Sequence, residues 1–224
     1  MLVLRGVSCL AKKPRPTFGC SSVNHVETSY FSFGKKLSKI KMNEFNEEII
    51  NPLLSEFRPR KESLDDKYDT LCIEFKEKKI CIPKFVKKSE SSRIQSNVKE
   101  YFTCGSDETN VLDSYSIADN MFRSSISAKA SEHIAIENYS YLKNVGYDSY
   151  FSKTYLKQNS KKIIMRMMED ENQEEIVRFL KLGFVSKITL KNMLPMAQEK
   201  DMTILASYIL NELGTQKARS NFAI

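Results

Sequence analysis

The chain has 224 residues, of which 41% are hydrophobic and 28% are charged, a composition typical of soluble globular proteins. Its 7 glycines and 6 prolines are too few for a turn-rich all-β fold, and no apolar run approaches the roughly 18 residues that a membrane span needs. We therefore expect a soluble, cytoplasmic and mainly α-helical protein with no transmembrane segment.

The net charge of +7 is concentrated in residues 1–41, which contain eight basic side chains and one acidic side chain. The rest of the chain is neutral, whereas a nucleic-acid-binding domain usually gathers Lys and Arg on its folded surface. Residues 1–41 are predicted to be a basic flexible leader, because they show neither helical nor strand periodicity. A mitochondrial targeting peptide and a segment that binds nucleic acid or a membrane surface are the alternatives. A lipoprotein signal ending at Cys9 is excluded by its short apolar segment.

The five cysteines and two histidines are widely spaced along the chain. They form no C-x-x-C pair and no His cluster, so the ligand spacing of a zinc site is absent. Nucleotide-binding and H-E-x-x-H motifs are absent as well. We therefore expect no metal and no cofactor, and, without a convincing secretory signal, free thiols in a reducing compartment.

Residues 42–105 are predicted to hold a helix and a β-hairpin. After Met42, apolar residues recur at helical spacing until Pro52, which would kink or end the helix. In TLCIEFKEKKICIP, near residues 70–83, apolar residues alternate instead, a pattern that is typical of two antiparallel strands.

The alternation also predicts the register of this hairpin. With Lys76 and Glu77 as a two-residue loop, the facing pairs are Phe75–Lys78, Glu74–Lys79, Ile73–Ile80 and Cys72–Cys81. The cysteine pair is then of the non-hydrogen-bonded type, with Cα atoms roughly 4.5 Å apart. A redox-sensitive cross-strand disulfide and two reduced, small apolar side chains are both compatible with this pairing, and the second is favoured because the sequence does not indicate an oxidising compartment.

Residues 106–214 are predicted to be helical, since apolar stripes at three- and four-residue spacing follow one another with capping residues between them. Residues 215–224 are predicted to be a tail. Four positions in the helical region are assigned as helix N-caps: Ser131, Asp148, Ser160 and Thr203.

One phrase occurs twice in the last fifth of the chain. EEIVRFLKLG ends at Leu182-Gly183 and TILASYILNELG ends at Leu213-Gly214, an offset of 31 residues. This offset is near the period of helix-pair repeats, roughly 33 residues in ankyrin and 34 in tetratricopeptide units. We therefore expect an antiparallel stack of helix pairs, in which Pro195 either shortens the first helix or kinks it.

The segment NMLPMAQEKDMTILASYILNELG resembles an ankyrin repeat, although Asn192-Met193 replaces the Thr-Pro opening and Pro195 stands where His is usual. The residues at comparable positions are Leu194, Ala197, Leu205, Ile209 and Leu213-Gly214. Over about residues 68–213, the hairpin, YLKQNSKKI, EEIVRFLKLG and AQEKDMTILASYIL are together similar to ankyrin-like C-terminal regions of uncharacterised proteins from low-GC Gram-positive bacteria. Several of those proteins carry leucine-rich repeats. The resemblance implies a bacterial origin and an interaction-type architecture, and it brings no known activity or catalytic residue.

The expected function is non-catalytic protein–protein interaction, because helical repeats leave one surface free for a partner. The partner is an unknown protein, nucleic acid is not expected, and the oligomeric state stays open. An enzyme remains the alternative, and it would require a pocket that gathers His133 with acids such as Glu132, Glu137 or Asp119. The candidate partner-contact residues are Arg178, Lys181, Lys187, Lys191, Gln198, Glu199 and Lys200.

Overall fold

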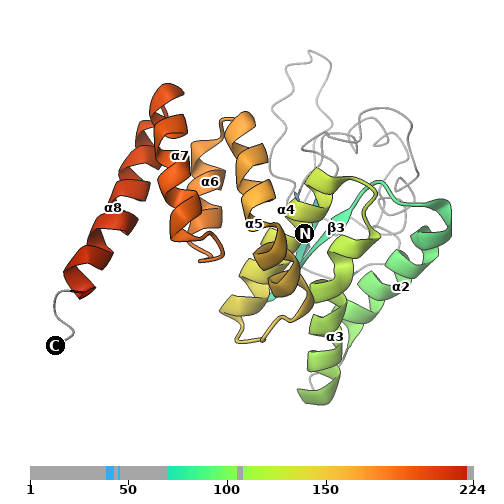
Figure 1. The fold of residues 1–224 in the computed structure, drawn as a ribbon. Coiled ribbons are helices and arrows are strands. Elements are labelled where there is room, and N and C mark those ends of the chain that lie inside the picture. The colour runs from blue at the N-terminus through green and yellow to red at the C-terminus, as the bar shows by residue number, and fades with distance from the viewer. Residues whose placement is uncertain (1–38, 43–44, 46–69, 105–107, 221–224) are drawn as a thin grey trace, which may run out of the picture. The chain divides into compact units, whose positions relative to one another are not determined.

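The computed structural model describes residues 39–42, 45, 70–104 and 108–220 (Figure 1). These residues are mostly helical and include a small sheet, which confirms the coarse fold class predicted from the sequence. The chain divides into two compact units, one up to Ser152 and one from Lys153 onward. Within the described ranges, no helix combines the length and the apolar character that crossing a membrane requires.

The first unit is built on a three-stranded sheet in the order β1-β2-β3. Strands β2 and β3 are antiparallel, and their register is the predicted one, with Cys72 opposite Cys81 and Ile73 opposite Ile80. The turn between them places Lys76 at φ 52°, in the left-handed region that a lysine occupies at a cost of roughly 1–2 kcal/mol. The hydrophobic alternation therefore determines this register despite an unfavourable turn residue. The strands are β1 (Lys39–Met42), β2 (Thr70–Phe75) and β3 (Lys78–Pro83).

Strand β1 corrects the predicted extent of the leader. Its first three residues belong to the segment 1–41, yet they pair in parallel with β2, with Lys39 opposite Cys72. Ile40 and Met42 are buried, while Lys39 and Lys41 point outward. The rest of the leader and most of the helix expected after Met42 lie outside the described residues.

The two faces of the sheet have different chemistry. Leu71 and Ile73 share an apolar face with Ile80 and Ile82, and helix α2 (Lys88–Thr103) packs at this face's end, where the rings of Phe75 and Phe102 meet edge to face at 5.9 Å. The opposite face carries the charged pair of the hairpin and the two cysteines. Helix α4 (Ala128–Asn144) packs against β3. A polar sheet face is thereby enclosed by a helix.

The helices between the sheet and the second unit differ from the sequence prediction at their ends. Helix α3 (Glu108–Asn120) is followed by a short 3-10 helix, η2 (Met121–Ser124). The N-cap of α4 is Ser127, whose hydroxyl accepts a hydrogen bond from the Ala130 N–H, and not Ser131, which lies inside the helix.

Helix α5 (Phe151–Glu169) is a single helix, so the N-cap predicted at Ser160 is wrong. The predicted cap at Asp148 is also wrong for the described hydrogen bonds. The carboxylate of Asp119, from α3, accepts hydrogen bonds from the N–H groups of Tyr150, Phe151 and Ser152. A side chain about thirty residues away in the sequence therefore caps this helix.

The second unit consists of most of α5 and of three further helices. These are α6 (Gln173–Leu180), α7 (Lys187–Glu199) and α8 (Thr203–Ser220). Helix α8 packs against both α6 and α7. Helix α7 runs through Pro195 without interruption, and the proline is exposed, so that water can replace the missing backbone hydrogen bond. The buried apolar side chains of this unit include Ile163, Ile164, Met168, Ile176, Phe179, Leu190, Met193, Ala197, Leu205 and Ile209.

Two turns of the second unit repeat each other at an offset of 30 residues. In the turn between α5 and α6, Glu171 has φ 56°, and in the turn between α7 and α8, Asp201 has φ 52°. The Asp170 N–H donates to the Arg166 carbonyl, and the Lys200 N–H donates to the Met196 carbonyl, both at 3.1 Å. The local repeat is therefore centred on these turns.

The two Leu-Gly pairs, in contrast, are not structurally equivalent. Gly183 follows α6 with φ 82°, the left-handed conformation that commonly terminates a helix. Gly214 lies inside α8, which continues to Ser220. Residues 215–220 of the predicted tail are thus helical, and residues 221–224 lie outside the described part of the chain.

The boundary between the two units also lies elsewhere than the sequence boundary at residues 105–106. Helices α3 and α4, which were assigned to the repeat region, belong to the first unit. The reason is a set of long-range polar contacts between α4 and the hairpin, which local sequence patterns do not reveal.

Candidate functional site

Helix α7 carries the central part of the predicted contact surface. Its buried side chains, Leu190, Met193 and Ala197, lie on one side of the helix. With 3.6 residues per turn, the remaining positions form a continuous exposed stripe on the other side. We call this stripe the outer face of α7, and it comprises Lys187, Ile188, Lys191, Asn192, Pro195, Gln198 and Glu199, all of which are exposed.

All seven predicted contact residues are exposed, but they are spread over two ends of the unit. Arg178 and Lys181 end α6, and Lys187 begins α7 after a short connection. Gln198 lies eleven residues further along α7, roughly 16 Å from Lys187 along the helix axis. The surface therefore has a basic end (Arg178, Lys181, Lys187, Lys191) and a polar end (Gln198, Glu199, Lys200).

Lys200, at the polar end, has a structural partner. Its Nζ lies 2.6 Å from Oε1 of Glu171, an ion pair that joins the two repeated turns. Close by in the chain, Oε1 of Gln173 accepts hydrogen bonds from the N–H groups of Ile204 and Leu205 and so caps α8. Thr203, the predicted cap, is the first residue of α8. Lys200 thus contributes to holding the turns together, whatever else it contacts.

The basic end combines two different electrostatic situations. Arg178 and Lys181 lie at the C-terminus of α6, where the helix dipole favours cations. Lys187 lies in the first turn of α7, which contains no acidic residue, so that the dipole disfavours its charge by roughly 0.3–1 kcal/mol. Helix stability therefore accounts for the first pair of cations and does not account for Lys187.

An exposed apolar side chain lies beside these lysines and was not singled out from the sequence. Ile188 is 73% exposed, more than any other large hydrophobic residue among the described positions. Ile204 and Leu210 of α8 are also more than half exposed. The available sequence signal for Ile188 was its place outside the 3.6-residue stripe of Leu190, Met193 and Ala197.

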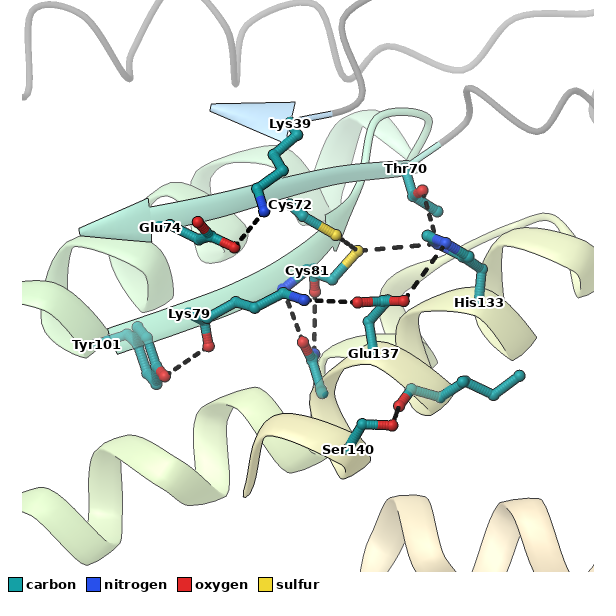
Figure 2. Close-up of polar contacts among 12 residues, drawn as sticks. Lys39, Thr70, Cys72, Glu74, Lys79, Cys81, Tyr101, His133, Glu137 and Ser140 are labelled. Atoms are coloured by element: carbon teal, nitrogen blue, oxygen red, sulfur yellow. Dashed lines mark hydrogen bonds and ion pairs between the residues drawn. The ribbon is translucent and has the colours of Figure 1, made fainter. Parts of the chain in front are cut away.

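A second cluster of functional groups lies in the first unit, between the hairpin and α4 (Figure 2). Nδ1 of His133 is 2.9 Å from Oγ1 of Thr70 and 3.9 Å from Sγ of Cys81. Its Nε2 is 4.0 Å from Oε1 of Glu137, and the other oxygen of Glu137 is 2.6 Å from Nζ of Lys79. This arrangement brings a thiol, an imidazole and a carboxylate together.

The electrostatics of the cluster do not favour a reactive thiol. Burial, followed by the hydrogen bond with Cys72, raises the pKa of Cys81 well above its ordinary value of 9.0. A catalytic cysteine needs the opposite shift, because the thiolate is the nucleophile. The pKa of Lys79 is subject to burial, which lowers it, and to the Glu137 carboxylate, which raises it by more, so that the net shift is upward. The cluster thus stabilises a protonated thiol and a charged lysine.

The other acids considered for an enzyme site are placed separately or are already engaged. The Asp119 carboxylate caps α5 and accepts a short hydrogen bond from the Ser152 hydroxyl, in addition to its three backbone donors. Glu132 is a buried residue of α4, next to His133 in sequence. Of the three acids, Glu137 is the one with a recorded approach to the imidazole. Within the described ranges, no three His, Cys, Asp or Glu side chains converge as a metal site would require.

Comparisons with protein-family models, with curated proteins and with solved structures yield no match for this chain.

Proposed function

We propose that the second unit is a protein-binding module of ankyrin-like helix pairs, and that it contacts an acidic protein surface through the basic end and the outer face of α7. No catalytic step is part of this proposal. It extends the resemblance stated for residues 68–213 to a mode of action.

The paired turns support the repeat character of this unit. Glu171 and Asp201 have the same left-handed conformation at an offset of 30 residues, and Lys200 links one turn to the other. Helix-pair repeats stack in this way, each pair burying an apolar face against its neighbour and leaving an extended surface for a partner.

The observation that carries the proposal is the exposure of Ile188 between two exposed lysines of α7. Lys187 and Lys191 flank it, and the local helix dipole opposes the charge of Lys187. Apolar anchors within a charged surface are the usual composition of a protein-binding patch. A net positive patch complements an acidic partner and accelerates the encounter with it.

The test is recovery of a partner by the doubly charge-reversed variant Lys187→Glu/Lys191→Glu, in affinity purification from the organism that encodes the chain. Both side chains are exposed, so the variant should fold, as checked by circular dichroism and thermal unfolding. We expect about tenfold less of the captured protein, a loss of about 1.4 kcal/mol. The matched control is Lys157→Glu/Lys161→Glu, which reverses two exposed lysines of α5 and should capture the partner normally.

Ile188→Ser provides an independent test of the apolar anchor. It should reduce capture without changing the charge, and the reduction should persist at high salt, where the contribution of the lysines is screened. Equal recovery of the same proteins by wild type, by the α7 charge reversal and by Ile188→Ser would refute a contact through the outer face of α7.

The basic N-terminal segment supports a second candidate function, binding to nucleic acid or to an anionic membrane surface. A variant that lacks residues 1–38 removes most of the net charge and retains β1. If the second candidate is correct, this variant should lose salt-sensitive binding to DNA, RNA or anionic vesicles. If the protein-binding proposal is correct, its capture of the protein partner should be unchanged.

A further inference from the structure

The facing cysteines of the hairpin form a pair with unusual surroundings. Cys72 lies on β2 and Cys81 on β3, directly opposite each other, and the Cys72 thiol donates a hydrogen bond to the Cys81 sulfur at 2.7 Å. The two-residue turn at Lys76 and Glu77 makes this a non-hydrogen-bonded pair, with Cα atoms roughly 4.5 Å apart. That spacing lies within the roughly 4.4–6.8 Å range found across disulfides, so the two sulfurs can be joined without moving the strands.

An imidazole lies between this pair and the solvent. Cys72 is 7% exposed and Cys81 is fully buried, whereas the His133 side chain is 41% exposed. Nδ1 of His133 is 3.9 Å from the Cys81 sulfur and is held in position by Thr70 (Figure 2). The pair therefore has an adjacent group that can take up a proton from Cys81 and exchange it with water.

We propose that Cys72 and Cys81 are a reversible dithiol–disulfide pair, oxidised by exchange with a low-molecular-weight disulfide, with His133 as the proton acceptor for Cys81. This site is independent of the protein-binding surface proposed above, because it lies in the first unit and uses none of the same residues.

The chemistry balances in two exchange steps. The Cys72 sulfur, the more exposed of the two, attacks a disulfide RSSR after losing its proton to solvent, which forms the mixed disulfide Cys72–S–S–R and releases one thiolate RS⁻. Cys81 then transfers its proton to Nδ1 of His133, and its sulfur attacks the Cys72 sulfur, which expels the second RS⁻. The two thiolates take up the two protons. In total, two protein S–H bonds and one R–S–S–R bond are replaced by one protein disulfide and two RSH molecules.

The burial of both sulfurs determines the kinetics of this reaction. Because burial raises the pKa of Cys81, its thiolate is scarce in the closed hairpin and depends on transfer to the imidazole. The first step requires a local opening that exposes Cys72 to the disulfide. Oxidation should therefore be slower than that of an exposed thiol and should show a distinct mixed-disulfide intermediate.

The test uses the full chain with Cys9, Cys20 and Cys104 replaced by Ser, which leaves Cys72 and Cys81 as its only thiols. After incubation of the folded protein with glutathione disulfide, the remaining thiols are alkylated and the intact mass is measured. We expect a loss of two hydrogen atoms, no alkylation, and a tryptic linkage between peptides 68–76 and 80–84. Dithiothreitol should restore two alkylatable thiols. In the same background, Cys81→Ser should stop at the glutathione adduct of Cys72.

The role of His133 is tested in the same background by His133→Asn. This variant should accumulate the mixed disulfide and form the intramolecular linkage about tenfold more slowly near neutral pH, since it lacks the proton acceptor. The difference between the variants should shrink as the pH approaches the ordinary thiol pKa, where hydroxide removes the proton directly. Equal closure rates at all pH values would exclude His133 from the reaction.

The folded and unfolded proteins give the decisive comparison. If the linkage forms in urea and not in the folded protein, even after prolonged incubation, the two thiols are an inert part of the core and the proposal is wrong. If the linkage forms in the folded protein and is reversed by dithiothreitol, the pair is redox-active in the native hairpin.

Discussion

The side chain of Asn138 pairs with the backbone of Cys81 as a neighbouring strand would. The Cys81 N–H donates to Oδ1 of Asn138 at 2.7 Å, and Nδ2 of Asn138 donates to the Cys81 carbonyl at 3.0 Å. Because β3 is at the edge of the sheet, these two backbone groups have no strand partner on that side. Asn138 is almost completely buried and thus closes an edge that would otherwise leave buried polar groups unpaired.

Replacing Asn138 with Ala should therefore be strongly destabilising. Its amide also donates to the Ala118 carbonyl at 2.9 Å, so the substitution leaves three backbone groups without their partner. Each unsatisfied buried group costs roughly 1–3 kcal/mol, and with partial relaxation we expect a total loss of about 3 kcal/mol in the free energy of unfolding by urea. The control is Asn144→Ala, at the exposed end of the same helix, which should stay within about 0.5 kcal/mol of wild type. A small effect of Asn138→Ala would mean that water replaces the amide at the strand edge.

The ion pair between Lys79 and Glu137 gives a second prediction. The Glu137 side chain is 8% exposed and that of Lys79 is 24% exposed, so removing one charge leaves the other poorly solvated. We expect Glu137→Gln to cost about 3 kcal/mol in urea unfolding, and Glu100→Gln, at an exposed site on α2, to cost little. The double replacement Lys79→Met/Glu137→Leu should recover most of the loss, because it removes both buried charges. If the double variant were no more stable than Glu137→Gln, the buried charge would not be the cause.

Stability should decrease at alkaline pH for two reasons that act in the same direction. The pKa of Lys79 is raised above 10.5, since the Glu137 carboxylate outweighs the opposing effect of burial. Burial, and then the neighbouring Tyr115, raises the pKa of Tyr141 to about 12. Both groups hold their protons more tightly when folded, so their contribution is complete below the unfolded pKa values of about 10 and is lost as the pH rises through the folded values.

Tyr141→Phe isolates one part of this alkaline effect. The variant loses the hydrogen bond from the Tyr141 hydroxyl to the Glu77 carbonyl at every pH, so its urea midpoint should be lower throughout. The further decrease between about pH 8 and pH 11 should be smaller than in wild type, because the unfolded variant has one fewer tyrosine to ionise. Parallel curves for the two proteins would contradict the raised pKa of Tyr141.

The cap of α5 provides a prediction about a residue that sequence patterns placed elsewhere. Asp119 is almost completely buried, and its carboxylate accepts from three backbone N–H groups at the start of α5. Asp119→Ala should cost about 3 kcal/mol, more than an ordinary exposed N-cap, because the N–H groups are left without a charged acceptor. Asp119→Asn should be intermediate, and Asp113→Ala, on the exposed side of α3, should be nearly neutral. Thermal unfolding followed by circular dichroism measures all three, and equal effects at both positions would exclude the capping role.

These residues show which parts of the structure could be derived from the sequence. The hairpin register was predictable because alternation fixes which side chains share a face, and the two-residue loop fixes the pairing of Ile73 with Ile80. Strand β1 was missed because KIKM is short, and its parallel partner lies beyond residue 69. Asp119 was missed as a cap because local rules examine only the residues next to a helix start.

The candidate contact surface was predictable in part for the same reason. Exposure of residues such as Lys187 and Lys191 follows from helix periodicity, and it was assigned correctly. The ion pair that engages Lys200 joins two turns 30 residues apart, which no periodicity argument specifies. The Leu-Gly phrase gave the correct region for the repeat and an offset of 31, whereas the turns repeat at 30.

The two glycines of that phrase allow a direct measurement of their inequivalence. Gly183 has φ 82°, and an added Cβ would be strained there, although no atom lies within 4 Å of it. Gly183→Ala should therefore cost about 1 kcal/mol in urea unfolding. Gly214 lies inside α8, also without a neighbour within 4 Å, so Gly214→Ala should stabilise the protein by about 0.5–1 kcal/mol through helix propensity. Opposite signs are expected only if the first glycine terminates its helix and the second continues one, and a loss of stability in both variants would restore the equivalence that the repeated sequence implies.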